Sequence, residues 1–341
     1  MKSVVNENSE VYYSQMYWND IPQVLRYMNK NFTKSEKTTW QSDFKKRFAK
    51  KPFEHALVLN CGNGWVEREF IDKKIITKAT AFDYSTDLLT QAKKQKKGRN
   101  ITYVQMDANK TNFKENEYDL VINVAALHHV QFINRISLQI AKALKANGLL
   151  VSFDYIGPGR NQYPKKQWTL ANKINNSLPE SIKHDSLFYP HLPTMMVTDP
   201  TEGIHANLII PNLKKYFKIL EQNDTNGSIA YLLLTHNKKV SKLKNPEKFK
   251  LIKKIIDEDK KLTESENLPI MFSYFIAEPN KKIISNNFRN QYFQLIENIR
   301  EYSSGIFLGS YGPKQVFVIA SNRYYHLLKN KLRHLKNYIG I

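Results

Sequence analysis

Short apolar runs alternate with helical patterns along the first half of this chain. Residues 56–59 form one such run, and a turn with two glycines, Gly62 and Gly64, follows it directly. Residues 66–71 then have the spacing of an amphipathic helix. A strand, a tight turn and a helix in this order are typical of a site that binds a nucleotide cofactor. Glycine lets the backbone approach the ligand, and the start of the helix offers N–H groups to it.

The alternation continues beyond this unit and predicts an α/β fold. Further strands are predicted at residues 79–83, 101–106, 118–124, 149–154, 215–222 and 271–277, the last of which closes the sheet. Helices are predicted at residues 17–31, 36–50, 87–94, 164–178, 227–236 and 246–262, and one more before a stop signal at Asn147-Gly148. Strands that alternate with helices form a doubly wound, Rossmann-like parallel sheet with its ligand across the carboxyl ends of the strands.

The pattern divides the chain into three parts. Residues 1–52 form a helical N-terminal cap, residues 53–280 the α/β domain, and residues 281–341 a basic C-terminal extension. Within the domain, residues 157–212 begin at a Gly-Pro-Gly break and are largely irregular and rich in proline. A long segment of this kind after the fifth strand predicts a lid insertion.

The glycine turn also indicates which cofactor fits. A dinucleotide fingerprint has a small residue three positions after the second glycine, where this chain carries Glu67. A carboxylate repels a pyrophosphate, so NAD and FAD are disfavoured, and the lysine of a P-loop is missing. The predicted cofactor contacts in the turn are Asn60, Cys61, Gly62, Asn63 and Gly64.

Polar residues follow the next strands at places that suit an adenosine. Asp83 ends the second predicted strand, where a carboxylate can accept from both ribose hydroxyls. Asp107 follows the third strand and can accept a hydrogen bond from an adenine amino group. Tyr84, Ala108 and Asn123 complete the predicted set of cofactor contacts.

These segments, in this order, resemble the class I S-adenosylmethionine-dependent methyltransferases, in particular their small-molecule branch. The resemblance rests on Val58-Leu59-Asn60-Cys61-Gly62-Asn63-Gly64, Phe82-Asp83-Tyr84-Ser85, Met106-Asp107-Ala108 and Ala126-Leu127-His128-His129, and continues at Asp154–Gln162 and Asp199-Pro200-Thr201-Glu202. It covers about residues 10 to 280 and is closest to a bacterial subgroup with a Cys-Gly-Asn-Gly-Trp turn that acts in surface-glycan or secondary metabolism. It implies S-adenosylmethionine as the cofactor and methyl transfer as the reaction.

Two positions depart from the family's pattern. Family members usually carry an acidic residue where Val58 stands, which holds the amino group of the cofactor, and glycine where Asn60 stands. Asparagine tolerates a positive φ better than most residues, so the turn can form. Without the acid at Val58, Glu67 or a backbone carbonyl is the candidate partner for the ammonium group.

The chemistry is expected where the fourth strand ends, at His128 and His129. In methyl transfer the protein supplies position, exclusion of water and, for a hydroxyl acceptor, a base. Neutral histidine suits that role near pH 7, so the pair is the predicted catalytic group, with a purely structural wall of the cofactor site as the alternative. Tyr155 and Arg160 are predicted substrate contacts, the arginine for a carboxylate or phosphate.

No metal site is expected, because histidine and acid spacings typical of metal ligands do not occur locally. Glu202 and His205, in the predicted lid, are weaker candidates for the site. The single cysteine, Cys61, excludes an internal disulfide and a cysteine-rich zinc site. No apolar run reaches the roughly 18 residues of a membrane span, and the first ten residues are polar, so a cytoplasmic enzyme is expected.

The charge of the chain is strongly positive. Lysine and arginine number 52 against 31 acidic residues, which gives +21 and a pI near 9.7. Such an excess occurs in proteins that bind nucleic acid or anionic membranes. The lysines are scattered, however, and no aromatic-interleaved basic motif is present, so nucleic acid is not favoured. Residues 323–339 predict a basic amphipathic helix that can lie on anionic lipid or dock on the body of the protein.

The sequence thus predicts a methyltransferase that transfers a methyl group from S-adenosylmethionine to a small-molecule acceptor, more readily at oxygen than at nitrogen or carbon. The acceptor can be a glycan or a secondary-metabolite precursor. One alternative is a catalytically inactive scaffold with the same fold, favoured by Val58 and Asn60. The other is an RNA methyltransferase, favoured by the charge and disfavoured by the absence of a base-flipping Asn/Asp-Pro-Pro-aromatic tetrad.

Overall fold

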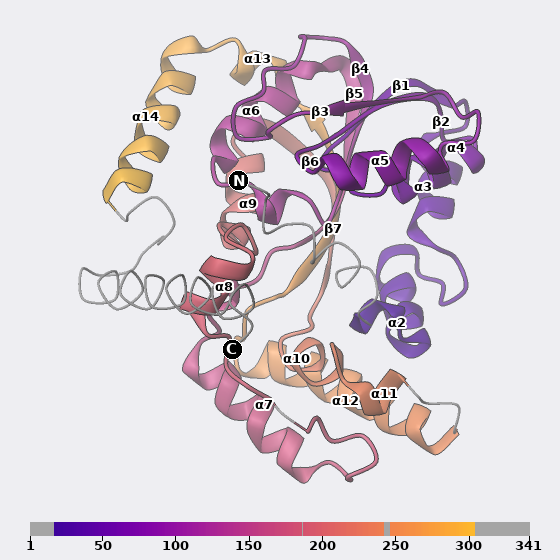
Figure 1. Ribbon diagram of the computed structural model, residues 1–341, viewed down its shortest axis with the longest axis vertical. Coiled ribbons are helices and arrows are strands. Elements are labelled where there is room, and N and C mark those ends of the chain that lie inside the picture. The colour runs from indigo at the N-terminus through magenta and orange to yellow at the C-terminus, as the bar shows by residue number, and fades with distance from the viewer. Residues whose placement is uncertain (1–16, 186, 242–245, 304–341) are drawn as a thin grey trace, which may run out of the picture.

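A seven-stranded sheet forms the centre of the protein (Figure 1). The computed structural model describes residues 17–185, 187–241 and 246–303. The strand order is β3-β2-β1-β4-β5-β7-β6, and the first five strands are parallel while β7 runs antiparallel to both neighbours. The strands are β1 (Phe53–Val58), β2 (Ile76–Asp83), β3 (Ile101–Gln105), β4 (Tyr118–Val124), β5 (Leu144–Tyr155), β6 (Phe217–Thr225) and β7 (Phe272–Pro279). This order confirms the predicted doubly wound α/β class and places the switch point, where ligands bind, between β1 and β4.

Helices cover both faces of the sheet. They are α2 (Pro22–Thr33), α3 (Trp40–Phe48), α4 (Trp65–Asp72), α5 (Thr86–Gln95), α6 (Ile133–Ala143), α7 (Lys165–Ser177), α8 (Leu192–Thr198), α9 (Ile209–Leu213), α10 (Ala230–Leu234), α11 (Lys238–Ser241), α12 (Pro246–Ser265), α13 (Lys281–Ile284) and α14 (Asn287–Ser303). Short 3₁₀ turns lie at η2 (Trp18–Asp20), η3 (Leu127–His129), η4 (Gly159–Asn161) and η5 (Ala206–Leu208). Within the described ranges, no helix combines the length and the apolar character that crossing a membrane requires.

Alternate residues of the strands build two separate cores. In β1, Ala56 and Val58 join the core beneath α2, α3, α4 and α12, whereas Leu57 joins the core beneath α6, α9 and α13. In β4, Ile122 and Val121 divide between the same two cores. Successive side chains of a strand point to opposite faces, so a sheet buried on both faces needs apolar residues at every position. The continuous apolar runs of the sequence are the direct consequence.

The N-terminal elements η2, α2 and α3 pack on the face of the sheet that contributes Tyr274 of β7 to their shared core. The described part begins with η2, where Trp18 stacks on Phe272 of β7 with ring centres 5.3 Å apart. Pro22 starts α2, because proline is favoured in the first turn of a helix, and Lys34 ends it in the left-handed conformation. Both helices are shorter than predicted: η2 takes up the start of the first, and residues 36–39 belong to the connection that precedes the second.

One predicted helix boundary is wrong. Asn147-Gly148 does not stop a helix, because α6 ends at Ala143 and both residues lie inside β5. Leu144 pairs with Tyr118 and Leu149 pairs with Leu120, so the residues between them bulge out of the β4–β5 ladder. Asparagine and glycine occur in β-bulges as well as at helix ends, because both tolerate unusual backbone conformations.

Two further predictions need correction in detail. The strand predicted at 271–277 to close the sheet is β7, which lies inside the sheet, and β6 forms the edge. The predicted lid insertion, residues 157–212, is less irregular than expected, because it contains α8, η5 and most of α9 besides α7. The helix predicted at 323–339 lies outside the described residues.

The start of the C-terminal extension docks on the domain. The carboxylate of Glu297 in α14 accepts from the backbone N–H groups of Asn134 and Arg135, at 2.6 and 3.0 Å. These groups lie in the first turn of α6, whose own N-cap residue, Phe132, provides no side-chain cap. A buried carboxylate at a helix N-terminus satisfies donors that would otherwise lack a partner.

We therefore expect Glu297→Ala to lower the free energy of unfolding by about 1–2 kcal/mol, the cost of losing a helix cap. Urea denaturation measures this change. Glu264→Ala, at an exposed acid of α12, is the matched control and should leave stability nearly unchanged. Equal stability of both variants would contradict the docking role of Glu297.

Candidate active site

The turn after β1 has the backbone shape that its residues predict. Asn60, Gly62 and Gly64 have φ values of 39°, 55° and 81°, all in the left-handed region. A Cβ at Gly64 would lie 2.7 Å from a carboxylate oxygen of Glu67 and would also meet the Tyr103 hydroxyl. The Asn60 side chain donates to the carbonyl of Ala126 at 3.1 Å, which ties the turn to the end of β4. The turn therefore needs glycine at Gly64 and tolerates asparagine at position 60.

Asp83 is directed at the glycine turn. One carboxylate oxygen accepts from the N–H of Gly62 at 2.8 Å, and the other accepts from the N–H of Ser85 at 2.8 Å. Burial raises the pKa of Asp83, although these backbone donors favour the charged form. Each carboxylate oxygen has a second lone pair for a further donor. The side chain thus lies where the sequence predicted a ribose-binding acid.

The remaining predicted adenosine contacts lie around the loop after β3. Asp107 accepts from the N–H of Asn109 at 2.9 Å and lies 3.2 Å from the Lys110 ammonium group. Ala108 is buried, whereas the Tyr84 ring is 70% exposed just beyond Asp83. Asp107 and Asp83 therefore follow the carboxyl ends of adjacent strands, as predicted.

Asn123 has a role that the sequence did not indicate. Its amide donates to Ser152 Oγ at 2.7 Å and to Asp154 Oδ2 at 2.8 Å, and its carbonyl oxygen accepts from the N–H of Leu127 at 3.1 Å. Both N–H donors are used within the protein, and the side chain is fully buried. Asn123 therefore holds Asp154 in place, and its side chain does not face a cofactor.

His128 is held by a buried carboxylate. Its Nδ1 lies 2.6 Å from Asp154 Oδ1, and the other oxygen of Asp154 accepts from the N–H of Leu127 at 2.8 Å. Burial disfavours a charged imidazole, but the attraction of Asp154 outweighs it and raises the pKa of His128 to about 9. Burial would raise the pKa of Asp154, but the same attraction keeps it below its ordinary value.

His129 faces the same carboxylate as its neighbour. Its Nδ1 lies 3.2 Å from Thr201 Oγ1, and its Nε2 lies 3.8 Å from Glu202 Oε2. The Nε2 of His128 is also 3.8 Å from that oxygen. Burial and the neighbouring His128 lower the pKa of His129. The three groups come together from sequence positions more than seventy residues apart, which local spacing could not reveal.

Tyr155 and Arg160, predicted as substrate contacts, are buried and contact the loops next to the site. The Tyr155 hydroxyl donates to the carbonyl of Pro158 at 2.9 Å, and its ring packs edge-on against His128. The Arg160 guanidinium is buried and donates to the carbonyl of Pro200 at 2.8 Å. These contacts fix the segment that carries Glu202, so the structure gives both residues a positioning role. His205 is also structural, because its Nδ1 is 2.6 Å from the carbonyl oxygen of Gln131.

Glu67, the candidate partner for the cofactor's ammonium group, is fully buried behind the turn. Its carboxyl lies against the Tyr103 hydroxyl, and burial raises its pKa to about 7. A group enclosed in this way is not presented to a ligand. The carbonyl groups of the turn therefore remain the candidates for that contact.

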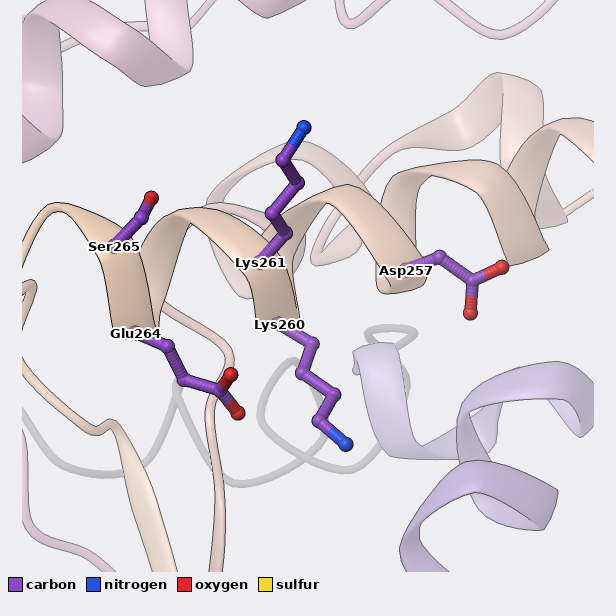
Figure 2. Close-up of a pocket in the computed structure, with 5 residues that line it drawn as sticks. All are labelled: Asp257, Lys260, Lys261, Glu264 and Ser265. Carbon is purple, nitrogen blue, oxygen red and sulfur yellow. The ribbon is translucent and has the colours of Figure 1, made fainter.

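A separate hollow lies along α12, away from this site. Its lining residues all come from one helix, and Figure 2 shows their side chains pointing in different directions. They are Asp257, Lys260, Lys261, Glu264 and Ser265. Because these polar groups do not converge, they do not form a binding site. The candidate active site is therefore the one at the switch point between β1 and β4.

Comparison with known proteins agrees with the geometry. Residues 57–152, from β1 through most of β5, match the family model described as a methyltransferase domain. This match supports the predicted methyltransferase class for this part of the chain, and the strand order agrees with it. No curated protein matches the chain.

Several solved structures are similar to this chain at low sequence identity. A phosphoethanolamine N-methyltransferase of Haemonchus contortus in complex with S-adenosyl-L-methionine is 18% identical over 69% of this chain and 50% of its own, with a TM-score of 0.45. An S-adenosylmethionine-dependent methyltransferase of Mesorhizobium loti is 16% identical over 67% of this chain and 91% of its own, with a TM-score of 0.40. A protein of Pyrococcus horikoshii is 13% identical over 76% of this chain and 99% of its own, with a TM-score of 0.39.

Proposed function

We propose that this chain is an active methyltransferase that uses S-adenosylmethionine to methylate a hydroxyl group of a small molecule. The observation that carries the proposal is the hydrogen bond between Asp83 and the N–H of Gly62. This bond holds the acid that we propose for the ribose hydroxyls beside the glycine turn that follows β1.

The residues present fit this cofactor. Gly62 supplies backbone without a side chain, Asp83 offers acceptors to ribose hydroxyls, and Asp107 offers an acceptor to an adenine amino group. When bound, the cofactor would supply an electrophilic methyl group carried by a positively charged sulfur, which leaves as a neutral thioether. The protein's task is to position the acceptor oxygen, exclude water and remove the hydroxyl proton.

The histidine pair is suited to the last of these tasks. Asn60 joins the turn to Ala126, which directly precedes η3, so His128 and His129 stand next to the cofactor turn. Asp154 and Thr201 hold their Nδ1 atoms. We propose that His129, whose pKa is lowered, accepts the hydroxyl proton, and that His128, whose pKa is raised to about 9, orients the acceptor oxygen as a donor. A base at this place favours oxygen over carbon as the methylated atom.

The inactive-scaffold alternative depended on Val58 and Asn60. Asn60 adopts the left-handed conformation that the turn needs, and its amide makes a productive contact. The active-enzyme proposal is therefore the stronger one for this geometry.

The test uses the full chain, cofactor with a labelled methyl group and an extract of small metabolites. We expect label to enter a small-molecule product and to survive mild base, as a methyl ether does and a methyl ester does not. His129→Ala should lower turnover about 100-fold or more while changing cofactor affinity little. His191→Ala, at an exposed histidine of the same segment as Glu202, is the control. Absence of any labelled product from cofactor-bound protein, or equal loss of turnover and affinity, would contradict the proposal.

A further inference from the structure

Two imidazoles and a carboxylate converge at the end of β4. His128, His129 and Glu202 each offer one ligand atom, and these three atoms all lie within 4.8 Å of one another. Each histidine is 3.8 Å from the carboxylate oxygen. Ligands of one zinc or iron ion, at bonds of about 2.0–2.2 Å, are separated by roughly 3.0–3.5 Å, so the two histidine–carboxylate distances exceed the spacing of bound ligands by less than about 1 Å.

Each of the three groups is oriented by a second contact. The Nδ1 of His128 is held by Asp154 at 2.6 Å, and the Nδ1 of His129 by Thr201 at 3.2 Å. The other carboxylate oxygen of Glu202 accepts from Asn161 Nδ2 at 3.3 Å. Histidines that bind metals usually have their second nitrogen held in this way by a carboxylate or another oxygen.

The segment that carries Glu202 is itself fixed to the histidines. The N–H of Ile204 donates to the carbonyl of His128 at 3.1 Å, and the N–H of Arg160 donates to the carbonyl of Gly203 at 2.6 Å. The carboxylates of Glu202 and Asp154 add two negative charges around the imidazoles. The group is thus preorganised, and its charge favours a cation.

We propose that His128, His129 and Glu202 bind a divalent first-row transition-metal ion such as zinc or iron(II). Two imidazoles and one carboxylate suit these borderline ions better than magnesium or calcium, which prefer oxygen ligands. Three protein ligands leave coordination positions open. The inference rests on the proposed function and changes the role of the histidines in it: with their Nε2 atoms on the ion they would not take up the hydroxyl proton. The ion would instead lower the pKa of an acceptor hydroxyl bound to it, so that the proton passes to solvent water before methyl transfer.

The test is calorimetric titration of metal ions into the full chain after chelation, with any affinity tag removed. We expect zinc and cobalt(II) to bind with one ion per chain and magnesium not to bind. Glu202→Gln and His129→Ala should each raise the Kd for zinc by at least about tenfold, and Thr201→Val, which removes an outer contact, by about tenfold. His205→Ala changes a nearby histidine outside the cluster and is the control. Circular dichroism establishes that each variant is folded.

The outcomes separate this inference from the proposed function. Failure of the wild type to bind zinc, or equal zinc affinity in the wild type, Glu202→Gln and His129→Ala, overturns the metal site. S-adenosylmethionine titrated into the chelated protein reports on the methyltransferase proposal independently. Cofactor binding without zinc binding would contradict the metal site alone. Zinc binding without cofactor binding would support the metal site and contradict the methyltransferase proposal.

Discussion

Asp83→Ala should weaken the binding of S-adenosylmethionine ten- to a hundredfold, or about 1.5–3 kcal/mol. The Asp83 carboxylate is the acceptor proposed for the ribose hydroxyls, and charge-assisted hydrogen bonds contribute on this scale. Its bond to the N–H of Gly62 also orders the turn, so the loss includes a contribution from a less rigid site. Calorimetric titration of the cofactor measures the effect.

Asp87→Ala is the matched control, because Asp87 lies four positions further on, in the first turn of α5. Thermal denaturation of both variants shows whether Asp83→Ala remains folded at the temperature of the titration. Unchanged cofactor affinity in a folded Asp83→Ala variant would refute the ribose assignment.

The stability of the protein should fall as the pH rises from 5 to 6.5, below the range in which His128 contributes, and Glu67→Gln should remove most of this fall. Burial raises the pKa of Glu67 from its ordinary value of 4.5 to about 7. Below about pH 4.5 the carboxyl is protonated in the folded and unfolded states and costs nothing. Between the two pKa values the unfolded chain releases the proton and the folded chain retains it, so stability decreases. Above pH 7 the full penalty of about 3 kcal/mol is present.

The groups that face Glu67 come from several elements: Tyr103 of β3, Asp83 of β2, Cys61 of the turn and Arg68 of α4. Urea denaturation at several pH values measures the dependence. Glu54→Gln, at an exposed acid of β1, is the control and should follow the wild type. A pH dependence as steep in Glu67→Gln as in the wild type would contradict this account.

The central part of the fold was predictable because its signals are local. The β4 boundaries agree with the prediction, since an unbroken apolar run between polar residues has one interpretation in a sheet covered on both faces. The turn was equally accessible, because Gly62 and Gly64 are needed for a backbone shape that few other residues adopt. The prediction at Asn147-Gly148 was wrong because this pair of residues occurs both at helix ends and in β-bulges. Only pairing with β4 determines which of the two forms here.

The site was predictable in its positions and less so in its contacts. Asp83 lies at the turn as expected, because the end of a parallel strand fixes where its side chain emerges. The pairing of His128 with Asp154 and the approach of Glu202 depend on tertiary packing between distant segments, which spacing along the chain does not encode. Arg160 shows the same limit, since the arginine predicted to bind substrate is buried and donates to the carbonyl of Pro200.

The most direct test of the central claim is a calorimetric titration of S-adenosylmethionine into the wild-type full chain. The structure predicts one cofactor molecule per chain with a dissociation constant in the micromolar range, as the glycine turn and Asp83 together form the adenosine site. A folded protein that shows no binding at millimolar cofactor would contradict it.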